Sequence, residues 1–467
     1  MPWCPAPVHM KSAHSDLRMR SVVESFEDPD EADGERKKGA GRCSAHDVLP
    51  LLVLTLSALI AVVLVATGGR MREATMYELG RKLLWKNATV RPPVMLFFVV
   101  AGWAWVVRLC RSRGMNIDVV LTGNVQPAAA TQDAALKLLC MLLFSHLVHL
   151  VASETGVLTW RPWFTCNVCL IVCVLALGAM PLRAFHAEAR LSLLRALYDS
   201  VVAPCGPVTF WHVIVADYLT SLARTFGDVQ LTACISWSIF RGERGDEHVR
   251  TSELWGRHYD ECNQSSLNAL MLALPFWWRL MQCFKVFSQT GEQKNLWNAL
   301  KYSTAFPLVY AGYLRKLDAG SGGHDHLFVM AAVVQSSYCF VWDVLMDWGL
   351  PERGRPGGGG GGACGWRMRG ELLVTRDKAL YLVLCAFNLV LRFTWTLTFL
   401  GALPGRGGGM FCVEVLEIAR RTVWAVFRIE WEIVHKGHTR TAASESDDLD
   451  AEELQPLGES HSKHLDD

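Results

Sequence analysis

The sequence predicts an all-α membrane protein, a bundle of about ten transmembrane helices. Hydrophobic residues make up 51% of the 467 residues and charged residues only 19%, which is too apolar for an ordinary soluble protein of this length. Apolar runs recur along the chain, and many reach the roughly 20 residues that cross a bilayer as a helix. Several runs also contain charged side chains, which are costly in lipid and typical of functional paths.

The N-terminal part is predicted to contain a tail and four spans. Residues 1–47 mix both charges with Pro and Gly and show no apolar periodicity, which is typical of disorder. Residues 186–202 mix Arg and Glu with Leu at helical spacing, so we expect an amphipathic helix at the membrane interface. The N-terminal transmembrane region, residues 48–205, has four apolar runs, at residues 48–69, 92–110, 135–153 and 164–182.

Residues 206–438 are predicted to form a second membrane region. Its first apolar run, residues 208–240, fits one helix and a second short one. A Gly-rich segment, residues 351–370, is predicted to be a flexible linker before the last two spans. Residues 439–467 are acidic and polar, so we expect a disordered tail. The other apolar runs of this region are residues 268–284, 298–314, 327–346, 379–403 and 410–431.

The rest of the composition argues against several classes of protein. The formal net charge of +1 gives no reason to expect a nucleic-acid partner. The 15 Cys show no disulfide or metal-ligand spacing, so most are predicted to be small buried hydrophobes, and we expect no metal or other cofactor. Asn87 begins a glycosylation sequon that is used only on the lumenal side of a membrane. Basic residues flank the first span on both sides and leave the orientation of the termini open.

Two carboxylates lie within one of the apolar runs. Asp343 and Asp347 are four residues apart and so share one face of a helix. Carboxylates this close repel each other unless cations lie near them, and we expect those cations to be Lys301, Arg392 or Arg420. The alternative is a helix end that reaches water.

Two further apolar runs carry cations beside aromatic residues. Arg392 lies in the middle of its run, too far from either end to reach the interface easily, and Trp395 follows one helical turn later. The Trp ring can donate its N–H or wall a narrow passage. Lys301 and Tyr302 stand at the start of a span and can both donate to an oxyanion, although these residue types are also common at membrane interfaces.

The last apolar run carries the most charge. Glu417, Arg421, Trp424 and Arg428 recur at spacings that place them on one helix face, with Arg420 beside them. The two adjacent guanidinium groups can bind an oxyanion bidentately, and Glu417 can hold them in place. The alternative is an amphipathic helix whose Arg side chains reach out to lipid phosphates. The four cations and three acids of these runs together suggest an anion path.

Five segments resemble the EXS domain of the xenotropic and polytropic retrovirus receptor family of phosphate exporters, which also occurs in plant PHO-type exporters and in the yeast Golgi phosphate-recycling protein. The resemblance runs from Val208 to His435. The segments are RLMQCFKVF, NLWNALKYSTAF, SSYCFVWDVLMDWGL, VLRFTW and LEIARRTVWAVFRIEWE.

This resemblance implies a bundle that conducts phosphate along an internal path. Two positions depart from the family pattern: Thr220 stands where relatives usually carry Asn, and the segment from Arg428 to Ile433 lacks the family's Asn and His. The long exporters begin with an SPX domain, which 47 disordered residues cannot encode, so the chain resembles a short, SPX-less branch. The residues that would line the path are Asp217, Thr220, Lys301, Tyr302, Asp343, Asp347, Arg392, Trp395, Glu417, Arg420 and Arg421.

The sequence therefore predicts a multi-pass transporter of inorganic phosphate and not an enzyme. We expect it in the Golgi or another endomembrane, with the plasma membrane as the alternative. A competing hypothesis is a membrane protein that retains or sorts Golgi glycosyltransferases without transport. The expected partners are inorganic phosphate and the lipid bilayer, and a homodimer and contacts with Golgi membrane proteins are left open.

Overall fold

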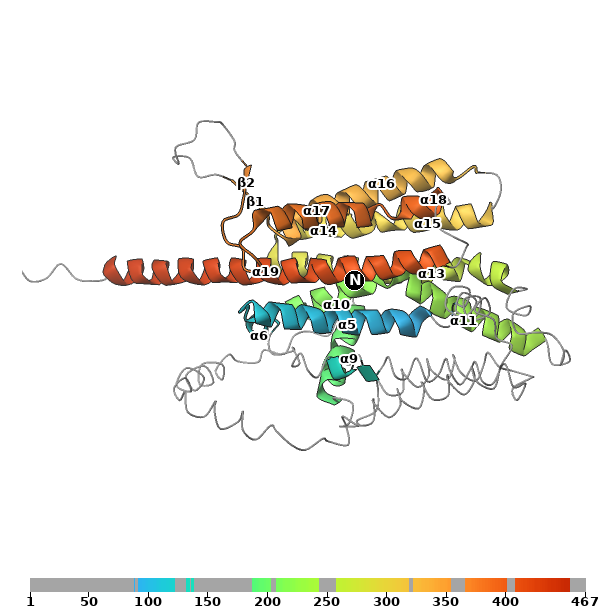
Figure 1. Ribbon diagram of the computed structural model, residues 1–467, viewed down its shortest axis with the longest axis horizontal. Coiled ribbons are helices and arrows are strands. Elements are labelled where there is room, and N and C mark those ends of the chain that lie inside the picture. The colour runs from blue at the N-terminus through green and yellow to red at the C-terminus, as the bar shows by residue number, and fades with distance from the viewer. Residues whose placement is uncertain are drawn as a thin grey trace, which may run out of the picture. The chain divides into compact units, whose positions relative to one another are not determined.

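A computed structural model gives the arrangement of the helices (Figure 1). The described residues all belong to the unit Gly68–Asp467. The predicted tail 1–47, three of the predicted spans (48–69, 135–153 and 164–182) and Asn87 lie outside them, apart from a few residues at the start of the third span. The structure describes residues 88, 91–121, 132–134, 136–137, 187–202, 207–242, 258–318, 322–353, 366–400 and 408–453.

The described part is almost entirely helical. Its two short strands, β1 (Pro351–Arg353) and β2 (Trp366–Met368), pair antiparallel, with Glu352 opposite Arg367. A π-helical turn, η5 (Asp343–Asp347), directly continues one helix. The helices are α5 (Arg91–Ser112), α6 (Ile117–Val120), α9 (Ala187–Val201), α10 (Phe210–Ser221), α11 (Ala223–Gly242), α13 (Ser266–Thr290), α14 (Gln293–Ser303), α15 (Ala305–Leu317), α16 (Asp325–Trp342), α17 (Lys378–Arg392), α18 (Trp395–Phe399) and α19 (Gly408–Glu453).

Side-chain caps fix where several of these helices begin and end. Thr209 starts α10 with a capping box, in which its hydroxyl accepts from the backbone N–H of His212 and the His212 ring accepts from the backbone N–H of Thr209. Ser265 and Asp377 cap the N-termini of α13 and α17 in the usual way. Gly291 ends α13 in the left-handed conformation, with φ of 68°, which glycine adopts without steric cost.

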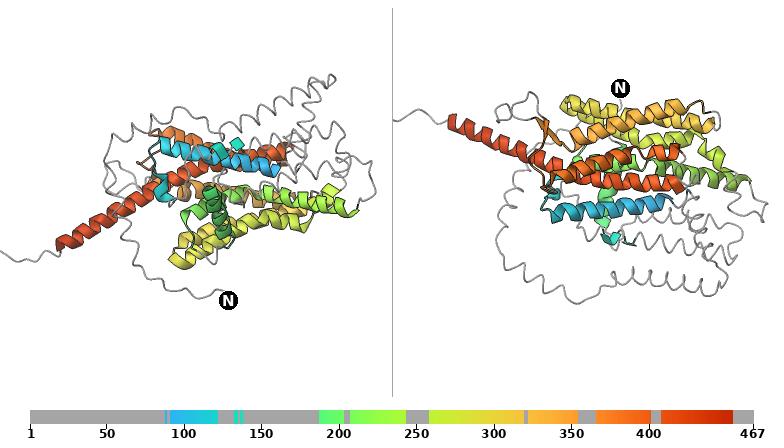
Figure 2. Two further views of the ribbon diagram at one scale, coloured as in Figure 1. Left: turned by 90° about the horizontal axis from the view of Figure 1, so that it is seen from below. Right: turned by 45° about the horizontal axis from the view of Figure 1, so that its top comes forward.

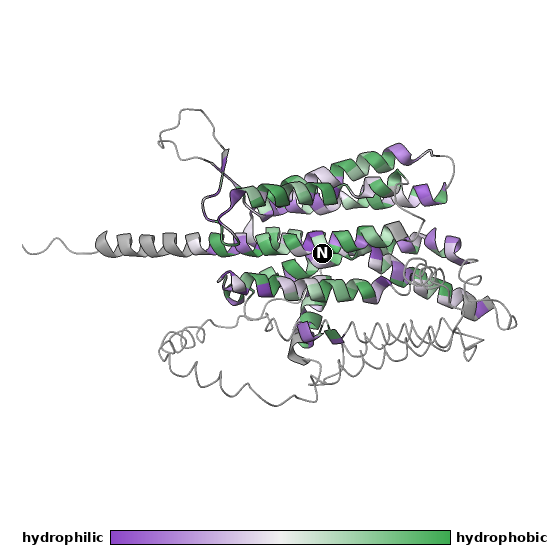
Figure 3. Cartoon of the chain, in the orientation of Figure 1, coloured by the Kyte–Doolittle hydropathy of each residue, from purple (hydrophilic) through white to green (hydrophobic). Residues whose placement is uncertain are grey.

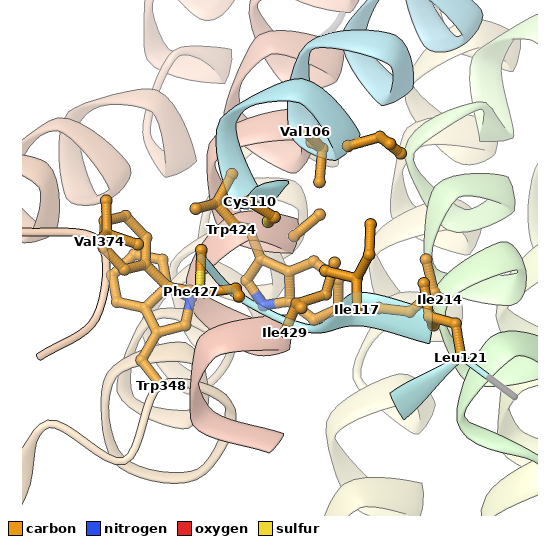
Figure 4. Packing of buried hydrophobic residues seen from close by; sticks show 14 of the residues in the cluster. Val106, Cys110, Ile117, Leu121, Ile214, Trp348, Val374, Trp424, Phe427 and Ile429 are labelled. Atoms are coloured by element: carbon orange, nitrogen blue, oxygen red, sulfur yellow. The ribbon is translucent and has the colours of Figure 1, made fainter. Parts of the chain in front are cut away.

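Helix α19 packs against α5, α10, α17 and η5, and α5 lies beside it in both further views (Figure 2). The buried core between these elements is drawn in Figure 4. The helices approach closely at Gly102 of α5, where an added Cβ would lie 2.5 Å from the hydroxyl of Thr422 on α19. Small residues at such crossings are typical of helix packing in membranes. The core includes Val106, Cys110, Ile117, Leu121, Ile214, Trp348, Val374, Trp424, Phe427 and Ile429.

Three helical segments of the described part are long and apolar enough to cross a membrane: Arg91–Ser112, Asp325–Asp347 and Lys378–Leu397. Figure 3 shows hydrophobic residues along most of α5, α16 and α17. On α17, Leu382 and Val383 are each 61% exposed. Apolar side chains on the outside and charged ones inside are what a lipid environment favours. The larger number of about ten spans stays a prediction.

Some predicted helices are divided differently in the structure. The run 298–314 is not one continuous helix: α14 ends at Ser303, and α15 begins at Ala305 after a break at Thr304. The run 379–403 is likewise broken, because α17 ends at Arg392 and α18 begins at Trp395. In the run 208–240 the second helix is not short, since α11 has 20 residues and α10 only 12.

The predicted linker and tail are more regular than expected. The first and last parts of the linker 351–370 form the paired strands β1 and β2. Helix α19 continues to Glu453, so the structure places in a helix residues 439–453, for which the sequence predicts disorder. Residues 438–453 contain no Gly or Pro, and several are strong helix formers, so the helix can extend beyond its packed part.

The cysteines also differ from the prediction at one place. Cys234 on α11 forms a disulfide with Cys262, in the helical turn of residues 258–263. The two residues are 28 positions apart, and only the folded arrangement brings them together. Cys110 and Cys283 are buried thiols, as composition suggested.

Candidate functional site

The charges that the sequence places inside apolar runs come together between α10, α13, α14, η5, α17 and α19. We call this set the central network. It contains six cations, Arg279, Lys301, Arg392, Arg420, Arg421 and Arg428, and five carboxylates, Asp217, Asp343, Asp347, Glu417 and Glu432.

Asp343 lies at the centre of this network and is only 1% exposed. One of its oxygens, Oδ2, accepts from Arg392 Nη2 at 2.6 Å and from Asn388 Nδ2 at 3.1 Å. Arg420 Nη1 lies 3.5 Å from the same oxygen. Two of the three cations that the sequence suggested for the carboxylate pair therefore lie beside Asp343.

Asp347 has different partners, because the last turn of α16 widens into η5. Two indole N–H groups donate to its carboxylate, Trp342 at 3.2 Å and Trp424 at 3.1 Å. Lys301 Nζ and Arg428 Nε lie 3.7 and 3.8 Å from it. The alternative of a helix end in water does not fit this carboxylate, whose side chain is only 13% exposed. π-Helical turns of this kind are frequent at functional sites.

Asp217 on α10 is held by α13 and α14. Its Oδ1 accepts from Arg279 Nε at 2.8 Å and from the Tyr302 hydroxyl at 2.6 Å. Lys301 Nζ lies 4.5 Å from the centre of the Tyr302 ring, within the range of a cation–π contact. Lys301 and Tyr302 are therefore buried near the C-terminal end of α14, inside the bundle.

Glu417 and Arg420 form a bidentate pair one turn apart on α19. Arg420 donates from Nε and Nη2 to the two carboxylate oxygens, at 2.8 and 2.6 Å. The Ser221 hydroxyl donates to Glu417 at 2.7 Å from α10. This geometry fixes the Arg420 guanidinium between Glu417 and Asp343, so it cannot turn away to reach lipid phosphates.

Arg421 is bound in another way. Its Nε donates to the Ser221 hydroxyl at 2.9 Å, and its Nη2 donates to the Thr220 hydroxyl at 3.3 Å. Its guanidinium carbon lies 4.5 Å from the centre of the Trp424 ring. Arg421 is only 6% exposed, and among the described residues no carboxylate lies within ion-pair distance of it. It is a buried cation whose contacts are hydroxyls and an aromatic ring.

Trp395 is anchored at the break between α17 and α18. Its indole N–H donates to the Ser336 hydroxyl at 3.2 Å, and that hydroxyl donates to the carbonyl oxygen of Arg392 at 3.1 Å. The indole thus holds the end of α17, on which Arg392 reaches Asp343. The break lies between Arg392 and Trp395, so they are not successive turns of one helix as the sequence suggested.

Residues 87–434 match the EXS family, which is most of the chain. The chain belongs to the EXS family. It is 25% identical over 350 residues to SPX and EXS domain-containing protein 1 of Dictyostelium discoideum, covering 72% of this chain and 36% of that protein. It is 31% identical over 268 residues to the xenotropic and polytropic retrovirus receptor 1 homolog of Danio rerio, covering 54% and 36%.

Another similar EXS protein is phosphate transporter PHO1 homolog 8 of Arabidopsis thaliana, 25% identical over 267 residues, with 56% of this chain and 33% of that protein covered. The chain thus spans about a third of the length of these curated relatives. The EXS match begins at residue 87, earlier than the predicted boundary at residue 206, and the division into domains stays a prediction.

The departure from the EXS pattern at the end of α19 has a structural counterpart. Glu430 is fully buried and accepts from Arg369, from the Tyr381 hydroxyl at 2.7 Å and from the backbone N–H of Val374 at 3.0 Å. It holds the segment before α17 against α19. The neighbouring Trp431, which stands at the place of the family's Asn, covers Gly349, where an added Cβ would lie 2.5 Å from the indole ring.

Several residues of the site were not selected from the sequence. Arg279 lies in the apolar run 268–284, so the criterion that selected Arg392 would have found it too. Ser221, Asn388 and Trp342 are uncharged and common in membrane helices. Their role in the network follows only from their contacts with carboxylates and guanidinium groups on other turns or other helices.

Proposed function

We propose that this EXS protein moves inorganic phosphate across a membrane along the central network. The observation that carries the proposal is Arg421, a buried guanidinium that contacts two hydroxyls and no carboxylate among the described residues. A buried cation that has no carboxylate in direct contact favours an anion beside it. The printed name of one similar protein, a phosphate transporter, supports phosphate as that anion.

The surrounding groups suit an oxyanion with several oxygens. The guanidinium of Arg421 supplies charge-assisted hydrogen bonds, and Thr220 and Ser221 add hydroxyls that can donate or accept. With all groups ionised, the cations of the central network exceed its carboxylates, and Lys436, which lies 3.6 Å from Glu432, adds a further, partly exposed cation. The carboxylates would orient the cations and keep phosphate weakly enough bound to be released. Trp395 would narrow the path beside Arg392.

The disulfide suggests how the bundle is oriented. Disulfides persist in the lumen of the secretory pathway and outside the cell, and they are rare in the cytosol. We therefore propose that the end of the bundle with Cys234 and Cys262 faces such an oxidising compartment. The three arginines Arg108, Arg111 and Arg113, at the opposite end of α5 from Arg91, fit a cytosolic end. Residence in the Golgi or another endomembrane, or in the plasma membrane, stays a prediction.

The test is flux of radiolabelled phosphate into liposomes that contain the purified protein. Arg421→Gln should reduce the rate roughly a hundredfold, since it removes the charge of the proposed anion site. Arg108→Gln is the matched control, because Arg108 is an exposed arginine of α5, outside the central network, and this variant should keep the wild-type rate. Near-normal flux through Arg421→Gln, at equal protein content, would refute the proposal.

A further inference from the structure

A second group of charges is buried outside the central network, and we call it the outer cluster. It consists of Arg91 on α5, Arg224 and Asp228 on α11, Lys316 on α15 and Glu414 on α19. Glu414 precedes Glu417 by one turn of α19, so the outer cluster directly adjoins the proposed path.

Arg91 bridges two carboxylates from different helices. Its Nη2 lies 2.8 Å from Asp228 Oδ1, and its Nη1 lies 3.9 Å from Glu414 Oε1. All three residues are more than nine-tenths buried. Charges buried this deeply are normally paired at every polar atom, because each one left unsatisfied is costly.

Here the pairing is incomplete on both sides. Within the described part of the chain, Arg91 Nε, Asp228 Oδ2 and Glu414 Oε2 are buried and have no hydrogen-bond partner. Arg224 Nη1 donates to the sulfur of Met410 at 3.5 Å, which is a weak acceptor. A donor and two acceptors therefore lie unused around one ion pair, a pattern that a ligand with both kinds of group would complete.

Lys316 adds a cation that is held by amides. Its Nζ lies 2.9 Å from Asn263 Oδ1 and 3.0 Å from Asn268 Oδ1, and Asn268 in turn donates to Gln230 at 2.8 Å. With all groups ionised, the outer cluster has three cations and two carboxylates, which leaves one positive charge without a balancing negative one.

We propose that the outer cluster binds a protonated phosphate group. Arg91 Nε and Arg224 would donate to its ionised oxygens, and Asp228 Oδ2 and Glu414 Oε2 would accept from its P–O–H groups. One negative charge would balance the cluster. That the source is inorganic phosphate on its way along the path rests on the proposed function. The phosphomonoester headgroup of a lipid offers the same chemistry, but with one negative charge it has a single P–O–H and can donate to only one of the two carboxylates.

This chemistry makes the site selective. Phosphate keeps at least one proton near neutral pH, whereas sulfate keeps none and can only accept hydrogen bonds. Two carboxylate oxygens would repel sulfate and accept from phosphate, and sites built on such a contact reject analogues that lack the donor. Glu414→Gln would replace an acceptor oxygen by a group that can also donate, so the preference against sulfate should fall.

Binding can be measured apart from transport, by equilibrium dialysis of radiolabelled phosphate with the full chain in phosphatidylcholine nanodiscs. The Arg421→Gln variant removes the central site, and we expect it to retain one bound phosphate that excess sulfate does not displace. Adding Glu414→Gln should weaken phosphate binding roughly tenfold and let sulfate compete. Glu261→Gln, an exposed glutamate in the 258–263 turn, is the control and should leave both unchanged.

No retained phosphate in Arg421→Gln, or equal competition by sulfate before Glu414 is changed, would overturn the proposal. The sulfate competition is measured with the outer cluster unchanged, so misfolding of Glu414→Gln cannot mask its result. Nanodiscs with added phosphatidic acid separate the sources: displacement of labelled phosphate supports a headgroup as ligand, and no displacement supports the free ion. Retained binding together with absent flux would refute the proposed transport and leave this site standing.

Discussion

The central network and the outer cluster bury similar charges in the same bundle, but they differ in how those charges are satisfied. In the central network, neutral groups complete the contacts of the carboxylates, although Arg392 Nε is buried without a hydrogen-bond partner in the described part of the chain: Asn388 joins Asp343, two indoles join Asp347, and Ser221 joins Glu417. In the outer cluster Asp228 and Glu414 share one guanidinium, and each leaves an oxygen without a partner among the described residues.

This difference separates two tasks that a transport protein must combine. A fully paired carboxylate orients its cations and adds rigidity, because moving it would break several contacts at once. In an incompletely paired cluster, the donors and acceptors that have no partner can form hydrogen bonds with a ligand. We therefore expect substitutions in the central network to disturb both stability and flux, and those in the outer cluster to change binding more than stability.

The largest expected effect is on flux. Arg420→Gln should lower phosphate flux in liposomes roughly a hundredfold, because it removes a charge of the path and leaves Glu417 and Asp343 facing each other without their shared cation. Arg224→Gln should lower it only a few-fold, since the central network stays intact. Equal losses in the two variants, at matched protein content, would contradict the proposed division between the two regions.

The charged residues of the central network could be predicted from the sequence because lipid makes them conspicuous. A charge such as Arg392 within an apolar run has few explanations other than a partner in the bundle interior. The neutral residues Tyr302 and Trp395 were selected because they stand beside Lys301 and one turn from Arg392, and the resemblance to EXS proteins supported that selection. Even so, the sequence left Lys301 open between a membrane interface and an internal path, and the structure adds that it is buried 3.7 Å from Asp347.

The remaining features depend on contacts between distant segments. Apolar periodicity gives no sign of the breaks at Thr304 and Phe393, although Pro307, whose ring clashes in a continuous helix with the carbonyl of Ser303, indicates the first of them. Asp228 and Glu414 also lie in apolar runs, but their common partner Arg91 stands at the edge of a span, where arginine is unremarkable. The Cys234–Cys262 pairing likewise needs the helical turn 258–263 to lie against α11.

Stability gives the next test of the comparison. Asp343→Asn should lower the free energy of unfolding by about 3–5 kcal/mol, since it leaves Arg392 and Arg420 buried without their shared carboxylate. Asp347→Asn should cost less, because its cations lie farther away, at 3.7 and 3.8 Å. Asp228→Asn should also cost less than Asp343→Asn, because Arg91, at 2.8 Å, is its single close cation among the described residues and its other oxygen has no partner there. Thermal unfolding in detergent micelles measures all three, and the reverse order would contradict the analysis.

The disulfide allows a test of whether the stability of α11 and the turn 258–263 depends on a covalent constraint. Closing a loop of 28 residues is worth about 3–4 kcal/mol in the chain-entropy model. Cys234→Ala should therefore lower the free energy of unfolding by about that amount and lower the midpoint temperature with it. A reductant should shift the midpoint of the wild type and leave that of the variant unchanged. In intact protein without reductant, a thiol reagent should label neither Cys234 nor Cys262. Labelling of Cys234 under those conditions would show that the disulfide is not formed.

The smallest expected effect concerns Thr220, the residue of the proposed path at which the resemblance to EXS proteins implies Asn instead. The Thr220 hydroxyl accepts from Arg421 at 3.3 Å and donates to the carbonyl oxygen of Asp217 at 2.7 Å. In Thr220→Asn the amide oxygen can still accept from Arg421, so only the second contact is lost. One hydrogen bond contributes about 0.5–1.5 kcal/mol, and we expect a matching small loss of stability.

Flux through Thr220→Asn should stay within about threefold of the wild type, with the change in the half-saturating phosphate concentration and not in the maximal rate. Thr220→Val is the informative comparison, because it keeps the shape of the side chain and removes both contacts to the hydroxyl. If the Thr220→Val variant conducted as well as the wild type, the hydroxyl would have no part in holding Arg421, and Ser221 alone would position that guanidinium.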